Sequence, residues 1–108
     1  MAGYYKLETA KDGQFFFNLK AGNHETVLTS ELYKQKQSAL DGIESVKKNS
    51  QVEAHYHREV SKKGKDFFHL VAANGQIIGK SEEYSSKSAM EDGIAAVKKI
   101  AATAEIKE

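Results

Sequence analysis

The feature that most constrains the fold of this chain is an internal duplication. When the sequence is shifted by 51 positions, residues 5–49 align without a gap on residues 56–100, and 19 of the 45 aligned pairs are identical. The phrase DGIxxVKK, for example, begins at Asp41 in the first copy and at Asp92 in the second. Such identity is well above chance, so the halves are expected to be two copies of one supersecondary unit.

The size of the repeat indicates that the two copies share one core. A unit of about 50 residues buries too little surface to be comfortably stable alone, whereas 108 residues suit one compact domain. The linker SQVEAH, residues 50–55, is short and lacks Pro and Gly, which favours halves that pack against each other. We therefore expect a single domain over 1–108, with repeats at 4–50 and 55–101. A short tail, 102–108, is expected to extend the second helix or to fray.

Each copy reads as strand, turn, strand, turn, strand, helix. The first turns, KDG and KKG, end on Gly13 and Gly64, as a three-residue loop with a left-handed last residue requires. Such a turn fixes the strand register. The predicted pairs on the buried face are Tyr5/Leu19, Leu7/Phe17, Tyr56/Leu70 and Arg58/Phe68. Those on the opposite face are Lys6/Asn18, Glu8/Phe16, His57/His69 and Glu59/Phe67.

The second turns, GNH and ANG, are predicted to bring Val27 opposite Leu19 and Ile78 opposite Leu70. An apolar face at helical spacing follows in each copy. The residues on these faces are Ala39, Ile43 and Val46 in the first copy, and Met90, Ile94, Val97 and Ala101 in the second.

The ends and the glycines of the helices carry further expectations. Ser86 or Ser88 is a suitable N-cap, and Ser88 with Glu91 would form a capping box. Gly42 and Gly93 lie inside the helices, where each costs about 1 kcal/mol relative to Ala. We hypothesise that a close approach of backbone, helix to sheet or helix to helix, offsets that cost.

These elements predict an α+β fold of two β-β-β-α repeats related by a pseudo-twofold axis. About six mostly antiparallel strands would form the sheet, with both helices packed on one face. The first strand of each copy could pair within its own half or cross to the other half, and the pattern leaves both arrangements open.

The paired motifs resemble a known family. They are G-x-F/D-F-F-x-L at residues 13–19 and 64–70, the asparagines Asn23 and Asn74, S-E-x-Y at residues 30–33 and 81–84, and DGIxxVKK. Together they resemble the YegP-like family of small bacterial proteins, whose domain of about 50 residues often occurs as a tandem pair. The resemblance covers almost the whole chain. It implies two β-β-β-α units and a bacterial cytosolic setting, and it implies no activity.

Composition narrows the classes of function. Sixteen basic and fifteen acidic residues give a net charge of +1, which is not the broad positive field of a dedicated nucleic-acid binder. The chain has no cysteine, so disulfides and Cys-based zinc sites are absent, and no cofactor is expected. No apolar run approaches the roughly 20 residues of a membrane span. A cytoplasmic, monomeric protein without membrane contact is therefore expected.

The candidate binding site is the sheet face that the helices would leave open. It comprises Phe16, Phe67, Lys6, Asn18, His57 and His69. Exposed aromatic rings among polar and basic groups can stack the bases of single-stranded nucleic acid. The favoured interpretation is that these phenylalanines are buried at the repeat interface or under a tail, because the charge is balanced and no complete RNA-binding motif is present.

The sequence supports a metal site or a catalytic site less well than it supports a binding face. His55, His57 and His69 could bind zinc, but the first copy has Lys6 and Asn18 at matching places, so a surface histidine pair is favoured and no metal is expected. The recurring carboxylates fit caps and turns, and no catalytic triad, phosphate loop or HExxH spacing occurs. The sequence therefore predicts a non-enzymatic interaction module whose unknown partner is a protein, with weak single-stranded nucleic-acid binding as the alternative.

Overall fold

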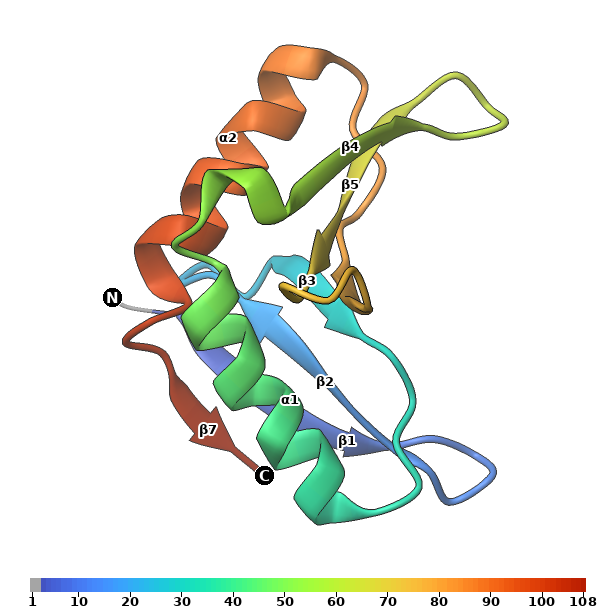
Figure 1. The fold of residues 1–108 in the computed structure, drawn as a ribbon, viewed down its shortest axis with the longest axis vertical. Coiled ribbons are helices and arrows are strands. Elements are labelled where there is room, and N and C mark those ends of the chain that lie inside the picture. The colour runs from blue at the N-terminus through green and yellow to red at the C-terminus, as the bar shows by residue number, and fades with distance from the viewer. Residues whose placement is uncertain (1–2) are drawn as a thin grey trace.

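The computed structural model describes residues 3–108 and confirms the expected order of elements in both copies. The first copy contains β1 (Tyr4–Thr9), β2 (Phe15–Lys20), β3 (Thr26–Ser30) and α1 (Lys36–Asn49). A 3-10 turn, η1 (Glu53–His55), leads to the second copy, which contains β4 (Tyr56–Val60), β5 (Asp66–Val71), β6 (Ile77–Lys80) and α2 (Lys87–Ile100). The strand β7 (Glu105–Lys107) follows (Figure 1).

All seven strands form one sheet in the order β4-β5-β6-β3-β2-β1-β7. Each first strand pairs within its own half, and the halves join where β3 and β6 run antiparallel at the centre. The tail departs from expectation, since residues 105–107 neither extend the helix nor fray but pair in parallel with β1. The sheet therefore has one strand more than the six that were predicted.

The first turns set the register as predicted. Gly13 and Gly64 have positive φ angles of 86° and 81°, and every predicted pair between β1 and β2 and between β4 and β5 is present. The pairs across the second turns were wrong by one residue. Leu19 faces Leu28 and Leu70 faces Gly79, because a bulge in each hairpin shifts the register at that point.

Both helices pack on one face of the sheet, and the predicted apolar faces lie in the core. The α2 helix begins at the Ser86 cap, whose hydroxyl accepts a hydrogen bond from Ala89 N–H at 3.1 Å. The capping box of Ser88 with Glu91 was wrong, since Glu91 instead binds Arg58. The first helix has Gln35 at its N-cap without a side-chain hydrogen bond.

The helix glycines face tyrosine rings and not backbone. A Cβ atom at Gly42 would lie 2.5 Å from Tyr33 Oη, and one at Gly93 would lie 2.3 Å from Tyr84 Oη. The tyrosine is the last residue of the repeated S-E-x-Y motif. The close approach that was hypothesised thus exists, but its partner is a side chain. The two most conspicuous motifs of the repeat, S-E-x-Y and DGI, form one packing unit.

The serine of the S-E-x-Y motif has a structural role in both copies. Ser30 Oγ accepts a hydrogen bond from Phe17 N–H at 2.9 Å and donates one to Glu31 C=O at 2.8 Å. Ser81 does the same for Phe68 and Glu82, at the same two distances. The hydroxyl replaces a ladder bond where the third strand leaves the second, so it satisfies a buried N–H group.

The first-strand tyrosines tie each copy to the other. Tyr5 donates its hydroxyl hydrogen to Ala101 C=O at 2.7 Å, at the end of α2. Tyr56 donates to Ser50 C=O at 2.8 Å, at the end of α1. Each bond satisfies a helix-terminal carbonyl that has no partner within its own helix. Two crossed hydrogen bonds therefore fix the helices against the shared sheet.

Candidate binding face

The polar side chains predicted as a site lie in one row on the sheet face opposite the helices. Four of them, Lys6, Asn18, His69 and His57, are connected through Thr29 and Lys80 in the centre. Lys107 extends the row across β7. Read from edge to edge, the paired residues are Lys107, Lys6, Asn18, Thr29, Lys80, His69 and His57. The row crosses all seven strands. Sequence reasoning missed Thr29, Lys80 and Lys107 because it left the strand order open.

The first-copy half of this row is linked by hydrogen bonds. Asn18 donates from Nδ2 to Glu8 Oε2 at 2.8 Å, and its Oδ1 accepts from Thr29 Oγ1 at 2.7 Å. Asn18 and Thr29 are half-buried. Because Asn18 and Thr29 already have partners, they present a fixed hydrogen-bonding pattern on this part of the face.

The second-copy half is built around Phe67. Phe67 is only 9% exposed. Lys80 Nζ lies 5.0 Å from the ring centroid, a cation–π distance, and the His69 ring meets it edge-on at 5.3 Å. His69 Nδ1 also contacts Glu59. The prediction that Phe67 is buried is confirmed, but its neighbours are same-face side chains and not a repeat interface or a tail. Phe16 is half-buried.

The three histidines do not meet as ligands. His57 faces His69 across the strands, as the register predicted, but His69 is bound to Glu59 and His55 lies in the 3-10 turn. Within residues 3–108 no three His, Asp or Glu side chains are placed to hold a metal ion. The arrangement is a cross-strand histidine pair on the surface.

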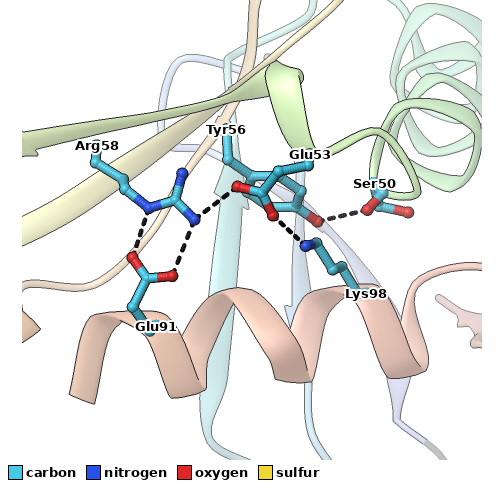
Figure 2. A network of polar contacts seen from close by, with 6 residues as sticks. All are labelled: Ser50, Glu53, Tyr56, Arg58, Glu91 and Lys98. Carbon is cyan, nitrogen blue, oxygen red and sulfur yellow. Dashed lines mark hydrogen bonds and ion pairs between the residues drawn. The ribbon is translucent and has the colours of Figure 1, made fainter. Parts of the chain in front are cut away.

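An ion-pair network stands at the edge of the sheet beside β4, on the helix side (Figure 2). Arg58 donates from Nε to Glu91 Oε2 at 2.5 Å and from Nη2 to Glu53 Oε2 at 2.7 Å. Lys98 contacts the other oxygen of Glu53. The network connects the linker turn, β4 and α2. The expectation that Arg58 is buried was wrong, because strand alternation places it on the helix face but β4 is an edge strand and leaves the side chain 34% exposed.

These contacts shift the ionisation of the groups involved. The hydrogen bond from Lys98 lowers the pKa of Glu53 most, and that from Arg58 lowers it further. Hydrogen bonds from Arg58 also lower the pKa of Glu91. The two carboxylates raise the pKa of Arg58 further above its usual range. Burial raises the pKa of Tyr5 and of Tyr56. The contacts of the network therefore favour the charged forms of Glu53, Glu91 and Arg58 at neutral pH.

A hollow of about 380 Å³ lies at the centre of the molecule's long sheet, beside the ends of β3 and β6. Its lining includes the hydroxyls of Ser30 and Ser81 and the acidic residues Glu31, Glu82 and Glu83. Both hydroxyls are committed to backbone groups, as described above, and no histidine lines the hollow. A serine nucleophile needs an adjacent base, which this arrangement does not supply.

The fold defines a class of protein, a pseudo-twofold α+β sandwich with one open sheet face built from two β-β-β-α units. A family model described as "Domain of unknown function (DUF1508)" matches residues 10–56 and 61–108. The chain belongs to this family, as the resemblance implied.

Bacterial relatives agree with this assignment. UPF0339 protein ACIAD0721 of Acinetobacter baylyi is 52% identical over 108 residues, covering 100% of this chain and 97% of the relative. UPF0339 protein YegP of Escherichia coli K12 is 52% identical over 98 residues, covering 91% and 89%.

The solved structures agree as well. The solution NMR structure of yegP from E. coli, titled a protein of unknown function, has a TM-score of 0.93 at 48% identity, covering 99% of this chain and 92% of that one. That of UPF0339 protein SO3888 from Shewanella oneidensis has a TM-score of 0.92 at 51% identity, covering 99% and 91%. Among the residues that the structure describes, no helix is long and apolar enough to cross a membrane.

Proposed function

We propose that the protein is a non-enzymatic interaction module of the bacterial cytoplasm, a monomer that binds another protein through the open face of its sheet. The observation that carries this proposal is the row of side chains that crosses all seven strands on the face without helices. The row offers fixed donors and acceptors and three lysines, Lys6, Lys80 and Lys107, on a regular scaffold.

The balance of charge on the face supports a protein partner. Glu8 and Glu59 stand beside the row and bind Asn18 and His69. Mixed charges with satisfied hydrogen bonds are typical of surfaces that select a partner by complementarity and not by net field. The hollow beside the ends of β3 and β6 has no base next to its two serine hydroxyls, which also favours binding over catalysis.

Single-stranded nucleic acid is the alternative, and the three lysines are the observation in its favour. Base stacking, however, needs an accessible aromatic face. Lys80 covers the Phe67 ring, and Phe16 is half-buried. Stacking on Phe67 would require Lys80 to move away, so the alternative is weaker than the sequence suggested.

Two measurements test the proposal. Backbone amide spectra are recorded during titration with a mixed single-stranded RNA and DNA pool at low salt. Shifts confined to β2, β5 and β6 that weaken with added salt would show that the partner is nucleic acid and not protein.

The second measurement uses a photo-crosslinking residue at position 80, compared in bacterial extract with one at position 48, on the exposed side of α1. We expect a discrete crosslinked protein from position 80 only, and equal crosslinking from both positions would contradict the proposal.

A further inference from the structure

The two outer edges of the sheet differ. On the first-copy side, β7 covers the edge by pairing in parallel with β1 (Figure 1). Glu108, the next residue, then forms a salt bridge with Lys36 at the start of α1. On the second-copy side, β4 pairs with β5 alone and ends the sheet.

The repeat identifies the groups at the open edge that correspond to those at the covered edge. A shift of 51 positions places Lys36 on Lys87 and Leu7 on Arg58. Lys87 begins α2 as Lys36 begins α1. Among residues 3–108, Lys36 has its acidic partner in Glu108, whereas no ion pair involves Lys87. A cation that is neutralised at one edge is therefore available at the other.

The backbone of β4 also has bonding capacity toward the open side. Phe68 directs its N–H to Ser81 Oγ and its C=O to Ser81 N–H, both toward β6. Because ladder bonds alternate in an antiparallel pair, its partner Arg58 directs its own N–H and C=O away from β5. The Tyr56 N–H is already bonded to Glu53 C=O, but its carbonyl follows the same alternation. The carbonyl of Tyr56 and the N–H of Arg58 are the pair that an added parallel strand uses.

A hollow of about 210 Å³ adjoins these groups, between β4 and the start of α2. Its lining consists of Arg58, Glu59, Val60, Asp66, Lys87, Met90 and Glu91. Arg58 is paired with Glu53 and Glu91, so Lys87 is the cation of this lining that no ion pair involves among residues 3–108. Val60 is 62% exposed. One lysine outside the ion pairs and an exposed apolar side chain thus lie beside the free strand. That combination suits an extended segment with an acidic residue and an apolar one.

We propose that the β4 edge is a strand-addition site for an extended segment of another protein that carries one acidic residue at the position of Glu108. The segment runs parallel to β4, as β7 runs along β1, so that a carboxylate beside Arg58 reaches Lys87 and an apolar side chain two residues later packs on Val60. A second copy of this chain is a poorer occupant. Its own C-terminal strand already covers its β1, so an exchange would cover one edge by exposing another.

The probe is a synthetic peptide, ATAEIKEAV, which joins the sequence of residues 102–108 to Ala-Val so that an apolar residue follows the acid. It is titrated into the whole protein at low ionic strength while backbone amide spectra are recorded. We expect saturable shifts at Arg58, Val60 and Lys87. No shift at several millimolar peptide, or shifts confined to β1 through displacement of β7, would overturn the proposal.

Matched variants test the chemistry of the site. Lys87→Glu should weaken binding about fivefold, whereas Lys48→Glu on the exposed side of α1 should leave it unchanged. A peptide with Lys in place of the Glu that precedes Ala-Val should recover binding to Lys87→Glu. N-methylation of the peptide Lys, which removes the N–H that would meet the Tyr56 carbonyl, should abolish binding. An equal loss of peptide affinity in Lys87→Glu and Lys48→Glu would show a general effect of net charge and would contradict a specific site.

Self-association is checked by sedimentation of the protein alone. A dimer with β4 amides shifted would identify a second copy as the occupant and refute the proposal.

The site is separate from the open sheet face, because its groups lie on the strand edge and the helix side. A failed peptide titration would therefore leave the proposed function untouched, and a failed crosslink at position 80 would leave this site untouched.

Discussion

Replacing Gly93 by Ala has two opposing effects on the free energy of unfolding, and the contact distances show which of them is larger. In an exposed helix interior the change would stabilise the protein by about 1 kcal/mol, because Ala loses less conformational entropy on folding. Here the new methyl group would stand 2.3 Å from Tyr84 Oη and 2.7 Å from its Cζ, where ordinary contact begins at 3.4 Å. The tyrosine ring must therefore move by about 1 Å before the methyl group fits.

The backbone of Tyr84 limits that movement. Its N–H donates to Asp66 C=O at 2.7 Å, and its C=O accepts from Asp66 N–H at 3.0 Å. Overpacking of this kind costs about 1–3 kcal/mol, which exceeds the helix gain. We expect Gly93→Ala to lower the free energy of unfolding by about 1 kcal/mol, seen in urea as a lower midpoint with an unchanged slope.

A double-mutant cycle isolates the cause. With Tyr84→Ala as the background the obstacle is gone, and Gly93→Ala should then stabilise by about 0.5–1 kcal/mol. The sign of the effect thus reverses between backgrounds. A Gly93→Ala protein that is more stable than wild type, or one that is destabilised equally in both backgrounds, would refute the assignment of the glycine to the tyrosine.

Three further sites test polar contacts that stabilise the fold. Glu91→Gln removes the carboxylate that Arg58 stabilises. Since its folded pKa is below the usual 4.5, the contribution is present above that pH and is lost as the pH falls through the folded value, so the difference in melting temperature from wild type should vanish in acid. Tyr56→Phe should cost about 1 kcal/mol in urea unfolding by leaving Ser50 C=O without its donor, and no loss would contradict the crossed bond. Ser81→Ala leaves a buried strand N–H unsatisfied and should cost about 1–3 kcal/mol, whereas Ser81→Thr, which keeps the hydroxyl, should recover part of it.

The sequence predicted the parts of the fold that depend on local chemistry. Gly13 and Gly64 mark turns whose geometry only glycine adopts without steric cost, so the turn and its register follow from three residues. The helix faces follow in the same way from apolar spacing. The duplication then supplied the pseudo-twofold, because two units with the same apolar surfaces bury them best against each other.

What the sequence could not predict depends on contacts between distant residues or on a single irregular residue. The bulges moved Leu28 and Gly79 into the places expected for Val27 and Ile78, since alternation assumes an uninterrupted ladder. The strand β7 has only three residues, all exposed, and carries no periodic signal. The alternation of side chains along β4 predicted the sheet face on which Arg58 lies, but it did not predict how far the side chain is buried.

The candidate face was predicted in part for the same reason. The register placed Lys6 beside Asn18 and His57 beside His69, because a tight turn connects each pair of strands. The central residues that connect the two pairs, Thr29 and Lys80, meet only through the β3–β6 pairing. No local pattern encodes that junction, so the sequence alone does not indicate that the row is continuous.

The comparison of the two copies separates residues that build the fold from residues that are available for binding. The glycine–tyrosine units, the bridging serines and the crossed tyrosines are identical in both copies, and each has a structural contact that explains it. Every symmetry-related pair in the open row differs, with Lys6 against His57, Asn18 against His69 and Thr29 against Lys80. A symmetric scaffold with an asymmetric row suits an asymmetric partner. A partner that was itself twofold symmetric would favour identical halves, so the divergence of the row supports a single, directional ligand on this face.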